Sequence, residues 1–136
     1  MIILGVVAIA VIVTSFQISG LLGQDASQET TRYEDTIDAD VIMPTKVSRP
    51  GCEEIDSCYI PSKIFIKAGQ TVTWMNQDSA FHSVTSGHYD SPIDDFDSGY
   101  MDPYQTFTLT FEQTGTIDYF CTLHPWMQGQ VIVEGI

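Results

Sequence analysis

Basic residues are scarce in this 136-residue chain, which has 5 Lys and Arg against 18 Asp and Glu and a formal net charge of −13. An acidic surface of this kind repels the phosphates of DNA and RNA, so nucleic acid is excluded as a partner. The balance instead favours a solvated domain whose partners are neutral or basic. The length allows one domain with an extension.

Charged side chains are absent from residues 1–22, and residues 2–13 are almost wholly aliphatic. A membrane-spanning helix needs about 20 mostly apolar residues, so we expect residues 1–22 to form a hydrophobic helix that anchors the chain in the membrane. A cleaved secretory signal is the alternative, although its positive n-region and A-x-A-like cleavage site are both missing. A buried core helix is a third interpretation, but no helix is predicted downstream for it to pack on. The first two interpretations place the rest of the chain outside the cytoplasm.

A hydrophobic period is also missing from residues 23–40, which are polar and acidic. Such a segment buries too little apolar surface to order itself. We therefore predict a flexible linker at residues 23–40, followed by one folded domain at residues 41–136.

Repeats, heptads and helical periodicity are absent from that domain. Apolar residues recur instead with period two between frequent turn signals, which is typical of an all-β sandwich. In the clearest strand, residues 105–111, Phe107, Leu109 and Phe111 alternate with outward Thr residues. With these phenylalanines we assign Trp74, Tyr119 and Val131 to the core. Further strands are expected at residues 41–47 (at an edge because of Pro44), 59–67, 71–75, 79–86, 116–120 and 130–134.

Residues 86–104 are rich in Gly, Pro and Asp and predict a long, solvated acidic loop. Clustered carboxylates could bind a hard cation such as calcium, but their spacing here matches no calcium motif.

Cysteine is rare: Cys52 and Cys58 lie close together, and Cys121 stands alone. In an exported domain such a pair predicts a disulfide, and the remaining thiol needs a separate explanation. Two free thiols, or a pair of metal ligands in a cytosolic protein, are the alternatives.

The loop between the strands expected at 116–120 and 130–134 carries Cys121, His124 and Met127 at three-residue intervals. Such a loop can fold these side chains towards one point. Thiolate, imidazole and thioether together select copper, and a Cys/His/His site with a weak axial Met is the blue-copper geometry. The second imidazole must come from His82 or His88. Zinc would leave Met127 unused, and a buried free thiol beside a packing Met is the structural alternative.

Two stretches around these residues resemble the cupredoxins, specifically the plastocyanin, amicyanin and pseudoazurin group. Residues 68–76 (AGQTVTWMN) and 82–84 (HSV) resemble the first ligand region of that group, and residues 115–127 (GTIDYFCTLHPWM) resemble the second, with the short spacers typical of amicyanin. Residues 96–99 (FDSG) resemble a stretch common in small plastocyanin-like proteins. The match covers about residues 55–134. The paired cysteines and the N-terminal hydrophobic segment are similar to membrane-tethered archaeal versions.

This resemblance implies a Greek-key β-sandwich that holds one type 1 copper, with four ligands: His82, Cys121, His124 and Met127. His88 is then not a ligand, and Gln128 is an alternative axial oxygen donor. The resemblance further implies that three polar residues hold the ligand loop in place: Asn76, Ser83 and Thr122. Many family members have Asn where this chain has Ser83.

The resemblance also implies an electron carrier that cycles between Cu(II) and Cu(I), is not an enzyme and has no small-molecule substrate. Redox proteins would act as donor and acceptor by docking briefly beside His124, because weak electron-transfer encounters use small interfaces. The implied apolar patch consists of Leu123, Pro125, Trp126 and Met101, and the acidic loops would steer a basic partner. We expect the domain on the extracytoplasmic face of the membrane, or secreted if the N-terminal segment is cleaved.

Two other classes of function are less well supported. A copper chaperone or storage module usually has an open site rich in Met or His. An accessory subunit of a copper oxidase needs either several further His pairs or two Cys on the ligand loop, whereas this chain has 3 His in total and a single Cys there.

Overall fold

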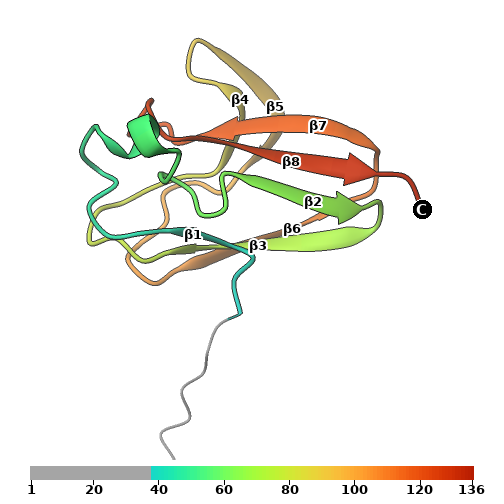
Figure 1. Ribbon diagram of the computed structural model, residues 1–136, viewed down its shortest axis with the longest axis horizontal. Helices are drawn as coiled ribbons and strands as arrows, with labels where there is room; N and C mark the ends of the chain where they lie inside the picture. The colour runs from blue at the N-terminus through green and yellow to red at the C-terminus, as the bar shows by residue number, and fades with distance from the viewer. Residues whose placement is uncertain (1–37) are drawn as a thin grey trace, which may run out of the picture. The chain divides into compact units, whose positions relative to one another are not determined.

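Residues 38–136 are the part of the chain that the computed structural model describes, and they form two mixed β-sheets (Figure 1). The predicted anchor at residues 1–22 lies outside the described residues, as does the predicted linker at residues 23–40 except for its last three positions. Within residues 38–136 no helix is both long and apolar enough to cross a membrane.

The smaller sheet has three strands in the order β1-β3-β6, with bounds Val41–Met43, Gln70–Asn76 and Thr106–Phe111. The larger sheet has the order β2-β8-β7-β4-β5, with bounds Lys63–Lys67, Gln128–Glu134, Gly115–Phe120, Thr85–His88 and Ser91–Asp97. The pairs β1/β3 and β2/β8 are parallel and the other neighbours are antiparallel. The chain crosses repeatedly between the sheets, and the predicted all-β sandwich is confirmed.

Alternating apolar residues place the core between the sheets. Val72 and Trp74 on β3 are fully buried, as is Val131 on β8, while their strand neighbours are more exposed. The Trp74 ring packs against Phe107, Phe111 and Tyr119, with ring centroids 5.5–6.2 Å apart. Burying apolar surface contributes about 25 cal/mol per Å², so this aromatic cluster is a main source of stability for the sandwich.

The prediction of a long acidic loop at residues 86–104 is wrong for the first half of that segment. Residues 85–97 form a hairpin, β4–β5, which projects from the edge of the larger sheet (Figure 1). Nearly every side chain on β5 is exposed. The buried Ser86 hydroxyl holds the hairpin together, because its oxygen accepts the backbone N–H groups of Asp95 and Phe96 at 3.1 Å each.

Three other strands are shorter or displaced relative to their predicted limits. The strand expected at 41–47 ends at Met43, directly before Pro44, and it does lie at a sheet edge. The strand expected at 59–67 begins only at Lys63. The strand expected at 79–86 is limited to β4, so that His82 precedes it.

A loop and a short 3₁₀ turn, η1 (Cys52–Ile55), connect β1 to β2. The Cys52–Cys58 disulfide is present and closes this connection. Figure 1 shows η1 at the same end of the sandwich as the loop between β7 and β8. Trp126 of that loop donates its indole N–H to Val47 O at 3.0 Å. The β1–β2 connection therefore packs on the loop that carries three of the predicted ligands.

Candidate metal centre

Three of the predicted ligands lie on one tight loop. Cys121 follows directly after β7, and His124 and Met127 precede β8. Backbone hydrogen bonds fold this loop on itself: Cys121 N–H donates to Met127 O (3.1 Å), His124 N–H to Cys121 O (3.3 Å), and Met127 N–H to His124 O (2.9 Å). The loop at residues 121–127, called the ligand loop below, is thus held by its own backbone.

His82 reaches the same point from the segment between β3 and β4. It forms an isolated antiparallel bridge with Met101, in which His82 N–H donates to Met101 O (3.3 Å) and Met101 N–H donates to His82 O (2.8 Å). The imidazole of His82 is fully buried. The bridge fixes the backbone of His82, and burial leaves its ring little room to move.

The side chains of His82, Cys121 and His124 converge. The two Nδ1 atoms lie 3.1 Å apart, and Cys121 Sγ lies 3.8 Å from that of His82 and 3.6 Å from that of His124. A point equidistant from these three atoms is about 2 Å from each, close to the roughly 2.0–2.3 Å bonds that imidazole and thiolate make to a divalent metal. The cluster therefore has the dimensions of a three-ligand metal site.

Met127 supplies the fourth donor of the expected set. It is fully buried on the ligand loop, whereas the neighbouring Gln128 is exposed. A thiolate, two imidazoles and a thioether are the donor set of blue-copper sites. His82, Cys121, His124 and Met127 thus fit copper, and the exposed Gln128 is the poorer candidate for the axial position.

His88 lies outside this cluster. Its side chain is 46% exposed, and its Nε2 lies 3.3 Å from Asp118 Oδ2 on β7. His82 is therefore the histidine that completes the site.

Both imidazoles of the cluster favour their neutral form. Burial lowers the pKa of His82, with Asp78 partly opposing this effect, and burial also lowers the pKa of His124. Imidazole binds metal only when neutral. Desolvation of these rings therefore prepares them for a metal at neutral pH.

Ser83 links the two ligand-bearing segments. Its N–H points at Cys121 Sγ at 3.3 Å, and its hydroxyl oxygen accepts Thr122 N–H at 2.9 Å and lies 3.0 Å from Thr122 Oγ1. A hydrogen bond to the sulfur tunes such a centre. In this chain Ser83 thus links the His82 segment to the ligand loop.

Asn76 acts one step further from the cluster. Its side-chain amide donates to Ala80 O (2.8 Å) and Met101 O (3.0 Å), and its oxygen accepts Asp78 N–H at 2.9 Å. These bonds fix both strands of the His82 bridge. Asn76 thus holds the backbone that carries His82, and within residues 38–136 its side chain makes no hydrogen bond to the ligand loop.

The predicted surface patch needs one correction. Leu123 is 39% exposed, and Pro125 and Trp126 are partly exposed, but Met101 is only 1% exposed because it packs in the core beside His82. Met101 therefore does not belong to a surface patch. Phe81, next in sequence to His82, is a further apolar side chain that is exposed (52%), and a single aromatic residue in a polar loop gives no periodic signal from which to predict it.

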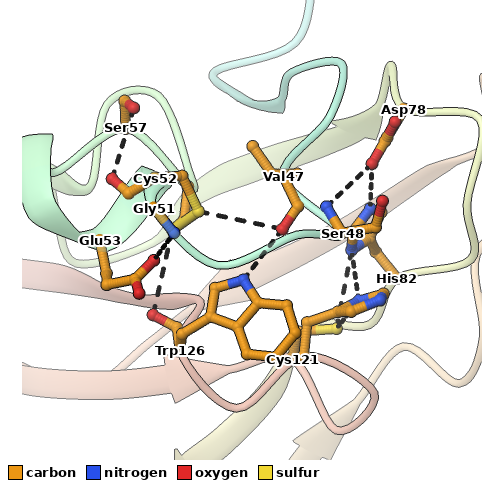
Figure 2. Close-up of a disulfide and its surroundings, with 12 residues drawn as sticks. Val47, Ser48, Gly51, Cys52, Glu53, Ser57, Asp78, His82, Cys121 and Trp126 are labelled. Atoms are coloured by element: carbon orange, nitrogen blue, oxygen red, sulfur yellow. Dashed lines mark hydrogen bonds and ion pairs between the residues drawn. A yellow bond between two sulfur atoms is a disulfide. The ribbon is translucent and has the colours of Figure 1, made fainter.

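Sequence reasoning also missed Asp78. Its carboxylate is 3% exposed and lies 3.1 Å from His82 Nε2 (Figure 2). The four-residue spacing from His82 was the available signal, but an acidic residue in a polar turn ordinarily lies in solvent.

Comparison with known proteins places this geometry in context. Residues 50–134 match the model of a family described as copper binding proteins, plastocyanin/azurin family. The chain is 41% identical over 76 residues to amicyanin from Paracoccus versutus, covering 56% of this chain and 58% of that protein. It is 32% identical over 85 residues to plastocyanin from Scenedesmus fuscus, covering 54% of this chain and 84% of that protein. The chain spans less than two thirds of the length of the amicyanins it matches.

Among solved structures, the fold is similar to that of a purple cupredoxin from Nitrosopumilus maritimus. The TM-score is 0.64 at 33% sequence identity, and the match covers 71% of this chain and 100% of that one.

Proposed function

Because the chain belongs to the plastocyanin/azurin family of copper-binding proteins, we propose that it carries single electrons between redox proteins outside the cytoplasmic membrane. The convergence of His82 Nδ1, His124 Nδ1 and Cys121 Sγ within 4.8 Å of one another carries this proposal. Bound copper would supply one-electron chemistry by alternating between Cu(II) and Cu(I). We propose an electron carrier that has no substrate turnover of its own.

The residues around the site would keep the ligands in one arrangement. The ligand loop is closed by its own backbone hydrogen bonds, and Ser83 joins it to the His82 segment. Interiors are close-packed, so buried ligands such as His82 and Cys121 have little room to move. A site that changes little between oxidation states costs little rearrangement during each transfer.

Electrons would enter and leave beside His124. This imidazole is partly exposed, whereas His82 and Cys121 are fully buried. The adjacent Leu123 and Pro125, together with Phe81, offer apolar surface for a short-lived contact with a redox partner. The disulfide and the apolar segment at residues 1–22 support an exported, membrane-anchored domain, because disulfides persist in oxidising compartments.

A visible absorption spectrum after addition of Cu(II) tests this function. We expect an intense blue band that disappears with ascorbate and returns with ferricyanide, is absent in Cys121→Ala and is retained in the matched control His88→Gln. A pale protein that binds copper without this band would contradict the proposal and favour copper storage or transfer. Turnover of oxygen or nitrite by the purified protein would favour an enzymatic function instead.

A further inference from the structure

The Asp78 carboxylate is buried beside the copper site and accepts four hydrogen bonds. Its Oδ1 accepts the backbone N–H groups of Lys46 (2.9 Å) and Ser79 (2.8 Å), and its Oδ2 accepts Ser48 N–H (3.1 Å) and lies 3.1 Å from His82 Nε2. Among the described residues, no Lys or Arg forms an ion pair with it. A buried charge is costly unless it is hydrogen-bonded, so these donors keep a negative charge at this position.

Two of these donors, the backbone N–H groups of Lys46 and Ser48, come from one short segment after β1. Lys46 adopts a left-handed backbone conformation with φ of 76°, which is uncommon for a residue other than Gly. Backbone N–H groups in turns of this kind form concave anion-binding sites. Burial alone would raise the pKa of Asp78, but the N–H groups of Lys46, Ser79 and Ser48 and the His82 ring outweigh it and lower that pKa below its ordinary value.

The carboxylate also determines which nitrogen of His82 faces the metal. A carboxylate can only accept, so His82 must donate its Nε2–H to Asp78. The neutral ring then has a free lone pair on Nδ1, which is the atom 3.1 Å from His124 Nδ1 and 3.8 Å from Cys121 Sγ. Carboxylates that bind the outer nitrogen of a metal-ligating His orient the ring and make it more basic.

The same segment contacts the second histidine. Val47, between Lys46 and Ser48, accepts the indole N–H of Trp126 at 3.0 Å (Figure 2). The Trp126 ring lies 5.3 Å from the His124 ring, centroid to centroid. Residues 46–48, called the strap below, thus contact Asp78, which lies beside His82, and Trp126, which lies beside His124.

We propose that Asp78, held by this strap, is a positioning residue that orients His82 and lowers the reduction potential of the copper site. The oxidised site is one charge more positive than the reduced site. A buried negative charge one imidazole away therefore stabilises Cu(II) relative to Cu(I). This inference rests on the copper site of the proposed function and does not depend on which redox partners the protein serves.

The test compares reduction potentials of the full chain, Asp78→Asn and a matched control, Asp118→Asn. The control removes the same charge from an Asp–His pair, because Asp118 contacts His88, which is not a ligand. We expect Asp78→Asn to raise the reduction potential, because Cu(II) loses stability relative to Cu(I) by a factor of about ten or more. For a one-electron couple, each factor of ten corresponds to ~59 mV. Asp118→Asn should shift it far less. Equal shifts in the two variants would overturn the proposal.

A second measurement uses the parent protein and therefore does not depend on whether a variant folds. Imidazole ¹⁵N chemical shifts of the metal-free full chain at neutral pH should show His82 protonated at Nε2 and unprotonated at Nδ1. The opposite tautomer would overturn the positioning role. Absence of the blue band in the parent protein would instead contradict the proposed function, so the two failures are distinguishable.

Discussion

Two buried tyrosines differ in the hydrogen bonding of their hydroxyl groups. Tyr59 Oη donates to Ser83 O at 2.6 Å, whereas Tyr119 Oη has no hydrogen-bond partner within the described part of the chain. Burial raises the pKa of both phenols above the ordinary value of about 10. The folded state therefore keeps both neutral at a pH where the unfolded chain ionises them.

The raised pKa of both phenols predicts how stability depends on pH. The contribution of these tyrosines is complete below pH ~10 and decreases as the pH rises above it, because only unfolding releases the protons. Tyr59→Phe and Tyr119→Phe should each weaken this alkaline loss. At pH 7, Tyr59→Phe should cost about 1–3 kcal/mol because Ser83 O is left without its donor, and Tyr119→Phe should cost little.

Urea unfolding of the metal-free protein between pH 7 and pH 11 measures both effects. Tyr100→Phe is the control, because that side chain is 65% exposed and its replacement should leave the pH profile unchanged. Equal destabilisation by Tyr59→Phe and Tyr119→Phe at pH 7 would contradict the assignment of the Ser83 bond.

At the scale of elements, the disulfide-closed connection between β1 and β2 stabilises the fold without supplying a ligand. Cys52 and Cys58 are six positions apart, and the chain-entropy model gives about 2 kcal/mol for a loop this short. The double variant Cys52→Ser/Cys58→Ser should therefore lose about 2 kcal/mol in urea unfolding while it keeps the blue band. Loss of the band in a folded variant would show instead that this connection is required to hold the copper ligands.

The elements that could be predicted are those whose two faces differ. Residues 105–111 and 71–75 alternate apolar side chains with Thr, and they form β6 and β3 close to the expected limits. The β4–β5 hairpin could not be recognised, because nearly all of β5 is exposed and no alternation marks it. Period-two patterns report a buried face, and this hairpin has almost none.

The ligands on the ligand loop could be predicted from the sequence, whereas the role of Asp78 could not. Cys121, His124 and Met127 are close in sequence, so their spacing alone indicated a metal site. The partners of Asp78 on the strap lie 30 and 32 positions away. Only the folded chain brings those backbone N–H groups to the carboxylate, and backbone groups leave no trace in the sequence.

For the whole molecule, the charges are divided unevenly along the chain. Residues 68–136 contain nine Asp and Glu and no Lys or Arg, and they include every copper ligand. Such a charge distribution would steer a basic redox partner towards the domain, and electrostatic steering of this kind accelerates association by about 10–10³-fold at low salt. We therefore predict that the rate of electron transfer to a small basic cytochrome falls as ionic strength rises.

Two exposed carboxylates at different distances from the site test where the steering acts. Asp102 follows Met101, which pairs with His82, whereas Glu112 lies in the turn before β7, at the opposite end of that strand from Cys121. Exposed charges are screened beyond about 10 Å at 0.1 M salt. Asp102→Asn should therefore reduce the low-salt rate in stopped-flow measurements more than Glu112→Gln, and both variants should converge on the parent rate at high salt. A rate independent of salt would rule out steering, and equal effects of the two variants would place the docking surface away from His82 and His124.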